Sequence, residues 1–367
     1  MKKQLVLGFG LAAGIAAGAW MALRPPDLPE LASAPAREVA VEARAAASSG
    51  PPRLAAASVL AIDPRSSAPR GAGKPRASLF NEYLGAKSYK ALYDRLRASA
   101  QANTPEGQFV LYEMLIKCAT VTDRTSRRPI VRSTEQKRDE FLASIPATDP
   151  QRDKRIAAYD EVAINRCAGM EGVTIAQADL NKLLANAAAG GDPKAQALAI
   201  EQDLWSARRA SGPEGRWGRD TVTLTDAQVD SLRQIAASRD PEAMQIAGRI
   251  LANAWADYSL RIGADNQVVE QRAFNQAWQL LACDYGYPCG EDNARVLSAC
   301  AYQGHCSASS LPDYMFYYGA SPYDSQLLAQ YREVLRNAVE SGNWSQLNVV
   351  RGPAPPGTRP FPLRPGG

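Results

Sequence analysis

The sequence predicts an all-α fold: an irregular, solenoid-like array of helical hairpins that ends in a disulfide-stapled C-terminal part. Three observations lead to this prediction. Apolar residues between 78 and 350 recur at spacings of three and four, and the alternation typical of strands is nearly absent. Helix starts are marked by a capping residue followed by proline. All six cysteines of the 367-residue chain lie in the same stretch.

Residues 1–23 have the composition of a signal peptide or a signal anchor. Lys2 and Lys3 precede an uncharged stretch, 4–23. The small residues before Trp20 suit a cleavage site, but an uncharged run of about 20 residues is also long enough to span a bilayer. Both alternatives place the rest of the chain in the periplasm, either soluble after cleavage or anchored to the inner membrane through residues 4–23.

Two proline-rich segments flank the predicted helical domain, 78–350. Segment 24–77 holds nine prolines and no aromatic residue, and 351–367 holds six prolines, three arginines and no acid. Such compositions bury too little apolar surface to offset the entropy lost on ordering. We therefore predict a disordered Pro/Ala-rich linker before the domain and a disordered Pro/Arg-rich tail after it.

The helix starts within the domain follow one pattern. Thr104-Pro105, Asp192-Pro193 and Asp240-Pro241 each place a capping residue before a proline at the first helical position. A leucine lies eight residues before each cap, an alanine four before, and a small residue three after. The unit is thus a helix, a tight turn and a second helix, with small residues where the two approach. The caps are 88 and 48 residues apart, so the period is irregular.

The stretch 184–199 contains an Ala-x-x-Gly-Asp-Pro-x-Ala core and resembles the Sel1-like branch of tetratricopeptide-type repeats. Residues 232–247 form a weaker copy. The regular spacing and the second Gly-rich turn of that family are missing here. The resemblance implies a non-catalytic interaction scaffold. The cysteine-rich part is also similar to a segment of exported bacterial proteins.

The cysteines form two short copies of the pattern Ala-Cys-x-Tyr-x-x-x-Cys, at 282–289 and 299–306. An even number of cysteines in an exported chain favours disulfides. The expected pairs are Cys283 with Cys289, Cys300 with Cys306, and Cys118 with Cys167. Pairing between the two copies stays open.

A zinc site is the alternative use of the four clustered cysteines, with His305 nearby. Five intervening residues exceed the usual ligand spacing, and an oxidising compartment disfavours free thiolates. We therefore expect no metal and no cofactor. His305 itself is expected in a solvent-facing turn.

Two arginine-rich loops are candidate anion sites, because guanidinium groups bind carboxylates and phosphates. The alternative, a solvated charged loop, is the more common case. Anionic cell-wall polymer would be the ligand in the periplasm, and nucleic acid is not expected there. The residues are Arg124, Arg127, Arg128 and Arg132 in the first loop, and Arg208, Arg209, Arg216 and Arg219 around Trp217 in the second.

A dense aromatic group near the end of the domain is a candidate contact patch for sugar or peptide. Because aromatic residues dominate cores, we favour the interpretation that it closes the end of the array. Asp313 and Asp324 flank the group as candidate paired carboxylates. The aromatic residues are Tyr314, Phe316, Tyr317, Tyr318 and Tyr323.

Composition limits the chemistry. The chain has one histidine and lacks a Gly-rich phosphate loop and a Gly-x-Ser-x-Gly motif, so we assign no catalytic residue. We expect a non-catalytic interaction or scaffolding protein of the bacterial cell envelope, with a protein partner there. One alternative is a carboxylate-based enzyme that cleaves cell-wall polymer, with a helical collar and a partly buried Glu beside Tyr or Trp. The other is a secretion or transport accessory protein.

Overall fold

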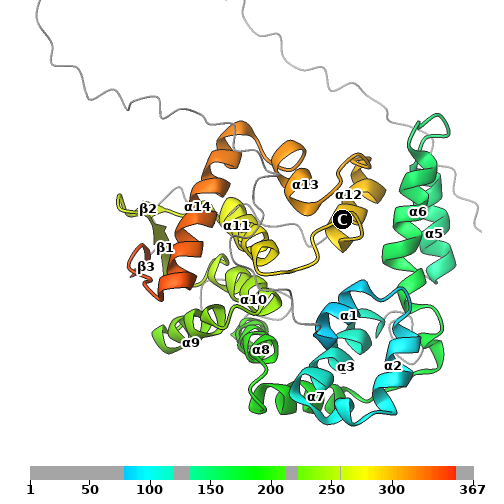
Figure 1. Ribbon diagram of the computed structural model, residues 1–367, viewed down its shortest axis with the longest axis horizontal. Coiled ribbons are helices and arrows are strands. Elements are labelled where there is room, and N and C mark those ends of the chain that lie inside the picture. The colour runs from blue at the N-terminus through cyan, green and yellow to red at the C-terminus, as the bar shows by residue number, and fades with distance from the viewer. Residues whose placement is uncertain (1–77, 120–132, 212–221, 257, 353–367) are drawn as a thin grey trace, which may run out of the picture. The chain divides into compact units, whose positions relative to one another are not determined.

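The computed structural model describes residues 78–119, 133–211, 222–256 and 258–352 (Figure 1). These residues form thirteen α-helices, three short 3-10 helices and a three-stranded sheet, which confirms the predicted helical character. The predicted signal, linker and nearly all of the tail lie outside them. The helices are α1 (Leu79–Gly85), α2 (Tyr89–Arg97), α3 (Pro105–Lys117), α5 (Thr134–Ser144), α6 (Arg152–Ala163), α7 (Gln177–Ala189), α8 (Pro193–Ser211), α9 (Asp226–Ala237), α10 (Pro241–Leu251), α11 (Gln271–Asp284), α12 (Ala294–Gln303), α13 (Leu311–Tyr317) and α14 (Pro322–Ser341).

None of the described helices combines the length and the apolar character that crossing a lipid bilayer requires. The candidate membrane segment, 4–23, falls outside the described ranges.

The predicted helix starts are present. The side chain of Thr104 accepts a hydrogen bond from the Gly107 amide at 3.0 Å at the start of α3. At the start of α8 the Asp192 carboxylate accepts a hydrogen bond from the Ala195 amide, and at the start of α10 the Asp240 carboxylate accepts one from the Ala243 amide. A proline stands at the first helical position after each cap, where its missing N–H costs no hydrogen bond.

The starts of α8 and α10 are joined by a buried ammonium group. Lys194 Nζ lies 3.0 Å from a carboxylate oxygen of Asp192 and 3.1 Å from one of Asp240. The same ammonium lies over the rings of Phe80 and Phe109, at 5.4 and 5.6 Å from their centroids. Burial opposes the charge, but the two aspartates outweigh it and raise the pKa of Lys194. The ion pair therefore stays charged wherever the aspartates are ionised.

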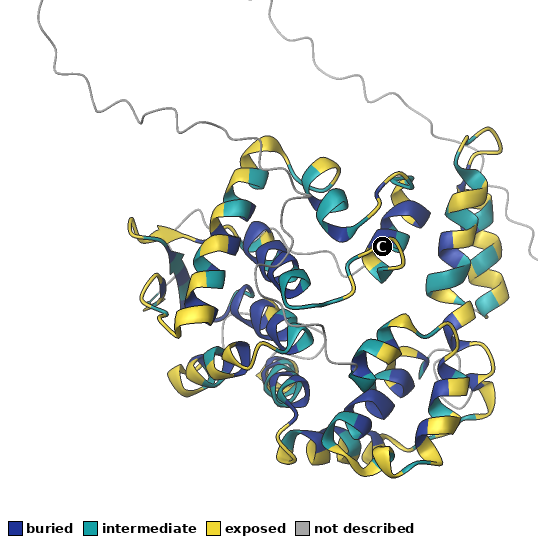
Figure 2. Cartoon of the chain, in the orientation of Figure 1, coloured by how far each residue is buried: buried dark blue, intermediate teal, exposed yellow. Residues whose placement is uncertain are grey.

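Buried side chains form three clusters, and Figure 2 shows α10 and α11 as largely buried helices. One cluster joins α8 to α14 and the sheet. A second joins α1, α2, α3 and α7 around the Cys118–Cys167 disulfide. The third joins α5, α6 and α12, where the Phe141 and Tyr159 rings stack with centroids 4.0 Å apart. Leu198 of α8 packs against both larger clusters.

The sheet is the feature that the sequence analysis missed. Strand β1 (Tyr258–Ile262) pairs antiparallel with β2 (Gln267–Val268) and with β3 (Leu347–Arg351). Periodicity gives little signal for strands of two and five residues, and β3 follows β1 only after four helices. Arg351, assigned to the tail from sequence, ends β3 and pairs with Asp226.

Gly248 sets how closely α10 approaches α11. A Cβ atom at this position would lie 2.1 Å from Cγ of the buried Trp278, far inside van der Waals contact. We predict that Gly248→Ala lowers the free energy of unfolding by about 1–3 kcal/mol or more, because a packed core must shift to admit the methyl group. Urea denaturation measures the change.

Gly85→Ala is the matched control. Gly85 is also helical, and a Cβ there meets no atom within 4 Å. Its unfolding free energy should stay equal to that of the unmodified chain or rise. Equal values for the two variants would contradict the close packing of α10 on α11.

Candidate functional site

The six cysteines form three disulfides in the structure. Cys118 pairs with Cys167, Cys283 with Cys289 and Cys300 with Cys306, which are the pairs expected from sequence. No free cysteine remains, so none of these residues offers the thiolate that zinc requires. Among the described residues, no group of three or more His, Cys, Asp or Glu side chains is placed to hold a metal.

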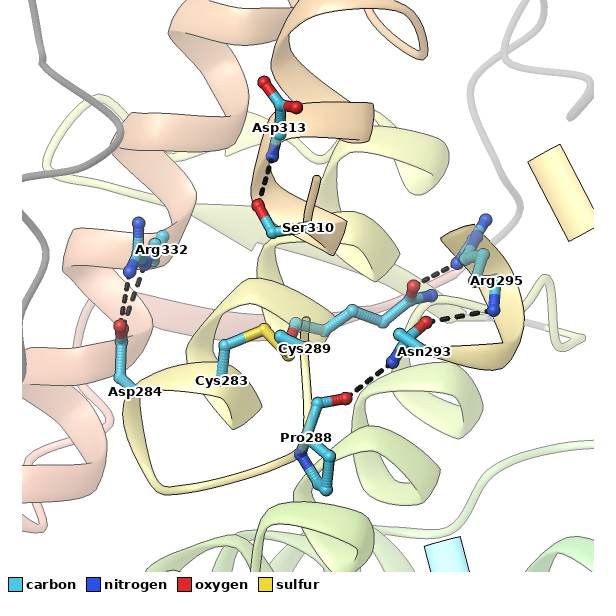
Figure 3. Close-up of a disulfide and its surroundings, with 10 residues drawn as sticks. Cys283, Asp284, Pro288, Cys289, Asn293, Arg295, Ser310, Asp313 and Arg332 are labelled. Carbon is cyan, nitrogen blue, oxygen red and sulfur yellow. Dashed lines mark hydrogen bonds and ion pairs between the residues drawn. A yellow bond between two sulfur atoms is a disulfide. The ribbon is translucent and has the colours of Figure 1, made fainter. Parts of the chain in front are cut away.

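The Cys283–Cys289 bridge fixes the loop that leaves α11 (Figure 3). Next to it, Asp284 pairs with Arg332 of α14, and the Asn293 side chain donates to the Pro288 carbonyl at 2.8 Å. The Cys289 carbonyl accepts a hydrogen bond from the amide of Leu311, the first residue of α13. The disulfide thereby positions α13 relative to α11.

The Cys300–Cys306 bridge fixes the end of α12. Gly304 ends this helix in the left-handed region at φ 76°, a conformation that glycine adopts without steric cost. Cys300 Sγ lies 3.6 Å from the Lys154 carbonyl, and Arg155 Nε donates to the Ala301 carbonyl at 2.9 Å. The end of α12 is thus held against α6.

Of the arginine residues expected to bind anions, only Arg208 and Arg209 lie within the described ranges. Arg208 lies on α8, is only 4% exposed, and bonds the Ala254 carbonyl between the rings of Trp205 and Trp255. It stabilises the core instead of a loop. Arg209 is exposed and donates to Ser206 Oγ. The other candidates, Arg216, Trp217, Arg219, Arg124, Arg127, Arg128 and Arg132, lie outside the described ranges.

The structure divides the aromatic group in two. Tyr314 and Phe316 pack against the largest core cluster, in agreement with the core interpretation. That interpretation is wrong for Tyr317, Tyr318 and Tyr323, which are 64%, 41% and 66% exposed. These three residues lie at the turn from α13 to α14, and we call them the aromatic corner.

His305 extends the aromatic corner. It is half-buried, not fully solvent-facing as expected, because its ring lies 4.9 Å from that of Tyr318 and 6.1 Å from that of Tyr314. The corner therefore combines three exposed phenol rings with one imidazole. His305 directly precedes Cys306, so the Cys300–Cys306 disulfide constrains the backbone that carries this imidazole.

Asp313 and Asp324 serve as helix caps. Asp313 accepts hydrogen bonds from the amide and hydroxyl of Ser309, and Asp324 from those of Ser321. Both carboxylates are therefore engaged at the starts of α13 and α14. This geometry removes the reason to consider them as a paired acid and base.

A second pair of acids, Glu113 of α3 and Glu242 of α10, was not singled out from sequence. Burial raises the pKa of Glu113 to about 7, with Lys117 and Arg249 opposing the shift. Burial, and then the charge of Glu113, raises the pKa of Glu242 to about 8. Neither carboxyl has an ion-pair partner within 4 Å among the described residues.

The sequence contains one feature that predicts the burial of Glu113. Glu113 is the single acid within the apolar run 109–116 of α3, so it is carried inward with its neighbours. Glu242 gave no comparable signal, because an acid in the first turn of a helix is usual. Only the approach of α10 to α3 makes the pair.

Comparisons with known proteins return no relative. No family matches the chain, and neither a curated protein nor a solved structure is similar to it at a significant level.

The Glu113–Glu242 pair predicts a fall in stability with rising pH. An unfolded Glu titrates near pH 4.3, and these folded carboxyls titrate near 7 and 8. Between about pH 4.5 and 8 the folded state binds more protons than the unfolded state, so its stability falls as pH rises through this window. Glu113→Gln and Glu242→Gln should each reduce that fall, on the order of 2 kcal/mol.

Denaturation curves at pH 5 and pH 9 measure the difference for each variant. Glu171→Gln is the control, because Glu171 is exposed in the short 3-10 helix Met170–Gly172. It should leave the pH dependence unchanged. A parallel decline in all three variants would show that the two buried carboxyls are not its source.

Proposed function

We propose that this chain is a non-catalytic interaction protein of the bacterial cell envelope, which binds a protein partner through the aromatic corner. The observation that carries the proposal is the exposure of Tyr317, Tyr318 and Tyr323 at one turn of an otherwise well-packed helical domain. Tyrosine supplies a large contact area with little entropy to lose, and it is enriched in protein interfaces.

The rigidity of the corner supports this role. Ser321 and Asp324 form a capping box at the start of α14, and Ser310 caps α13. Arg272 of α11 donates to the Gly319 carbonyl at 2.8 Å, within the turn itself. A preorganised turn binds with a smaller loss of entropy than a mobile one. The Sel1-like pattern at 184–199 points to the same class of function.

The disulfides support an extracytoplasmic location. All six cysteines are oxidised, and such bonds persist in compartments like the periplasm, whereas cytosolic thiols are kept reduced. We place the domain there, either released or tethered through residues 4–23. The Pro/Ala-rich segment 24–77 then gives it reach.

Photo-crosslinking in the native host tests the proposal. A photoreactive residue in place of Tyr317 or Tyr323 should give one discrete protein adduct, because both side chains point to solvent at the proposed interface. Tyr318→Ser, introduced in the same chain, should reduce the adduct at least tenfold by removing a central contact.

Lys182 is the control position. It is exposed on α7, a helix whose buried residues belong to a different cluster from the one against which Tyr314 and Phe316 pack. A photoreactive residue at Lys182 should give no such adduct. The same adduct from both positions, or none from the corner, would contradict the proposal.

A second candidate function is carboxylate-based cleavage of cell-wall polymer. The observation that favours it is the Glu113–Glu242 pair, in which both side chains are half-buried. Tyr112 is adjacent to Glu113, and Tyr287 lies near the pair. Burial, and then the charge of Glu242, raises the pKa of Tyr287. Because the two pKa values are about 7 and 8, the two carboxyls together carry about one proton between pH 7 and pH 8. Glycoside cleavage requires one protonated and one ionised carboxyl.

Release of reducing ends from purified peptidoglycan tests this second candidate. The unmodified chain should release them, and Glu113→Gln and Glu242→Gln should each lower the rate at least a hundredfold, because each removes an essential proton donor or acceptor. Glu171→Gln should retain the full rate. Equal rates in all variants, or no release by the unmodified chain, would exclude it.

A further inference from the structure

A cavity of about 260 Å³ lies among α2, α3, α5, α6 and α12, away from the aromatic corner. Tyr89 and Tyr159 are its buried walls, and Cys167 of the Cys118–Cys167 disulfide also lines it. Tyr302 of α12 is half-exposed at its edge. Segments from distant parts of the chain thus build one small enclosed site.

The walls of the cavity are held in fixed positions. Tyr159 stacks on Phe141 at 4.0 Å, and the Tyr302 ring meets both of them edge-on, with centroids 5.6 and 5.9 Å away. Arg138 of α5 forms a two-point ion pair with Asp160 of α6, at 2.7 and 2.8 Å. The cavity therefore exists before any ligand arrives.

The polar groups of the cavity are mostly donors. Lys117 and Lys137 line it, and neither ammonium has an ion-pair partner in the described part of the chain. Thr134 and the phenols of Tyr159 and Tyr302 add hydroxyl groups that form no side-chain hydrogen bond among the described residues. Among the residues that the structure describes, no acidic side chain lines the cavity.

Carboxyl groups lie near this site without lining it. Glu113 precedes Lys117 by one helical turn, and the charge of Lys117 lowers the pKa of Glu113 against the larger effect of burial. Glu140 follows Lys137 by one helical turn, but Lys137 forms no ion pair among the described residues. The two ammonium groups are the only charged side chains among the described residues that line the cavity.

We propose that this cavity binds an anionic sugar: one hexose ring that carries a carboxylate or a phosphate. A hexose offers the hydroxyl acceptors that match the phenols and Thr134, and the acidic group matches Lys117 and Lys137. The volume suits a single ring, since 260 Å³ equals about nine water molecules at ~30 Å³ each. The ligand site is thus distinct from the arginine loops expected from sequence.

Isothermal titration calorimetry on the full chain tests this assignment with three probes that differ only at carbon six. These are D-glucuronate, D-glucose 6-phosphate and neutral D-glucose. At least one of the two anions should bind in a one-to-one ratio, at least tenfold more tightly than glucose. Tighter binding of glucuronate assigns a carboxylate, and tighter binding of glucose 6-phosphate assigns a phosphate.

The variant with both Lys117→Gln and Lys137→Gln should lose at least tenfold in affinity for the better anion. Its melting temperature should stay unchanged, because both side chains are exposed and make no ion pair among the described residues. Lys182→Gln removes an exposed lysine elsewhere and should bind normally. Absence of binding by both anions, equal binding of glucose, or full affinity of the double variant would overturn the proposal.

Discussion

The architecture depends on one buried ammonium group, that of Lys194. Asp192 and Asp240 each use one carboxylate oxygen to cap a helix and the other to meet this ammonium. The Lys194 ammonium therefore fixes where α8 and α10 begin relative to each other. The Phe80 and Phe109 rings above the ammonium connect the same point to α1 and α3. Loss of the cation would leave a buried aspartate uncompensated, a costly state in a low-dielectric interior.

The described helices follow no regular repeat, and covalent cross-links connect them instead. A regular solenoid stabilises each hairpin through identical neighbours. The described hairpins here are unequal in length and spacing, and three disulfides cross-link them: one joins the end of α3 to the segment after α6, and two close the loops that follow α11 and α12. The long bridge from Cys118 to Cys167 closes a loop of 49 residues, which the chain-entropy model values at about 4 kcal/mol. The two short bridges fix local turns.

The sequence predicts local features of this molecule well and long-range ones poorly. Proline after a capping residue, glycine at a helix end and paired cysteines are local signals, and the structure contains the helices, turns and bridges that they indicate. The sheet, the burial of Arg208 between two tryptophans and the meeting of Glu113 with Glu242 each require residues distant along the chain. The spacing of apolar residues along the chain carries no information about contacts between residues that are distant in sequence. The cavity among five helices was missed for the same reason.

The seven residues from Cys300 to Cys306 form one small covalent ring that borders two surfaces. Tyr302, within the ring, forms the edge of the cavity, while His305, also within it, lies against Tyr318 of the aromatic corner. Because both residues belong to this ring, the backbone at the edge of the cavity and the backbone that carries the imidazole share one covalent constraint.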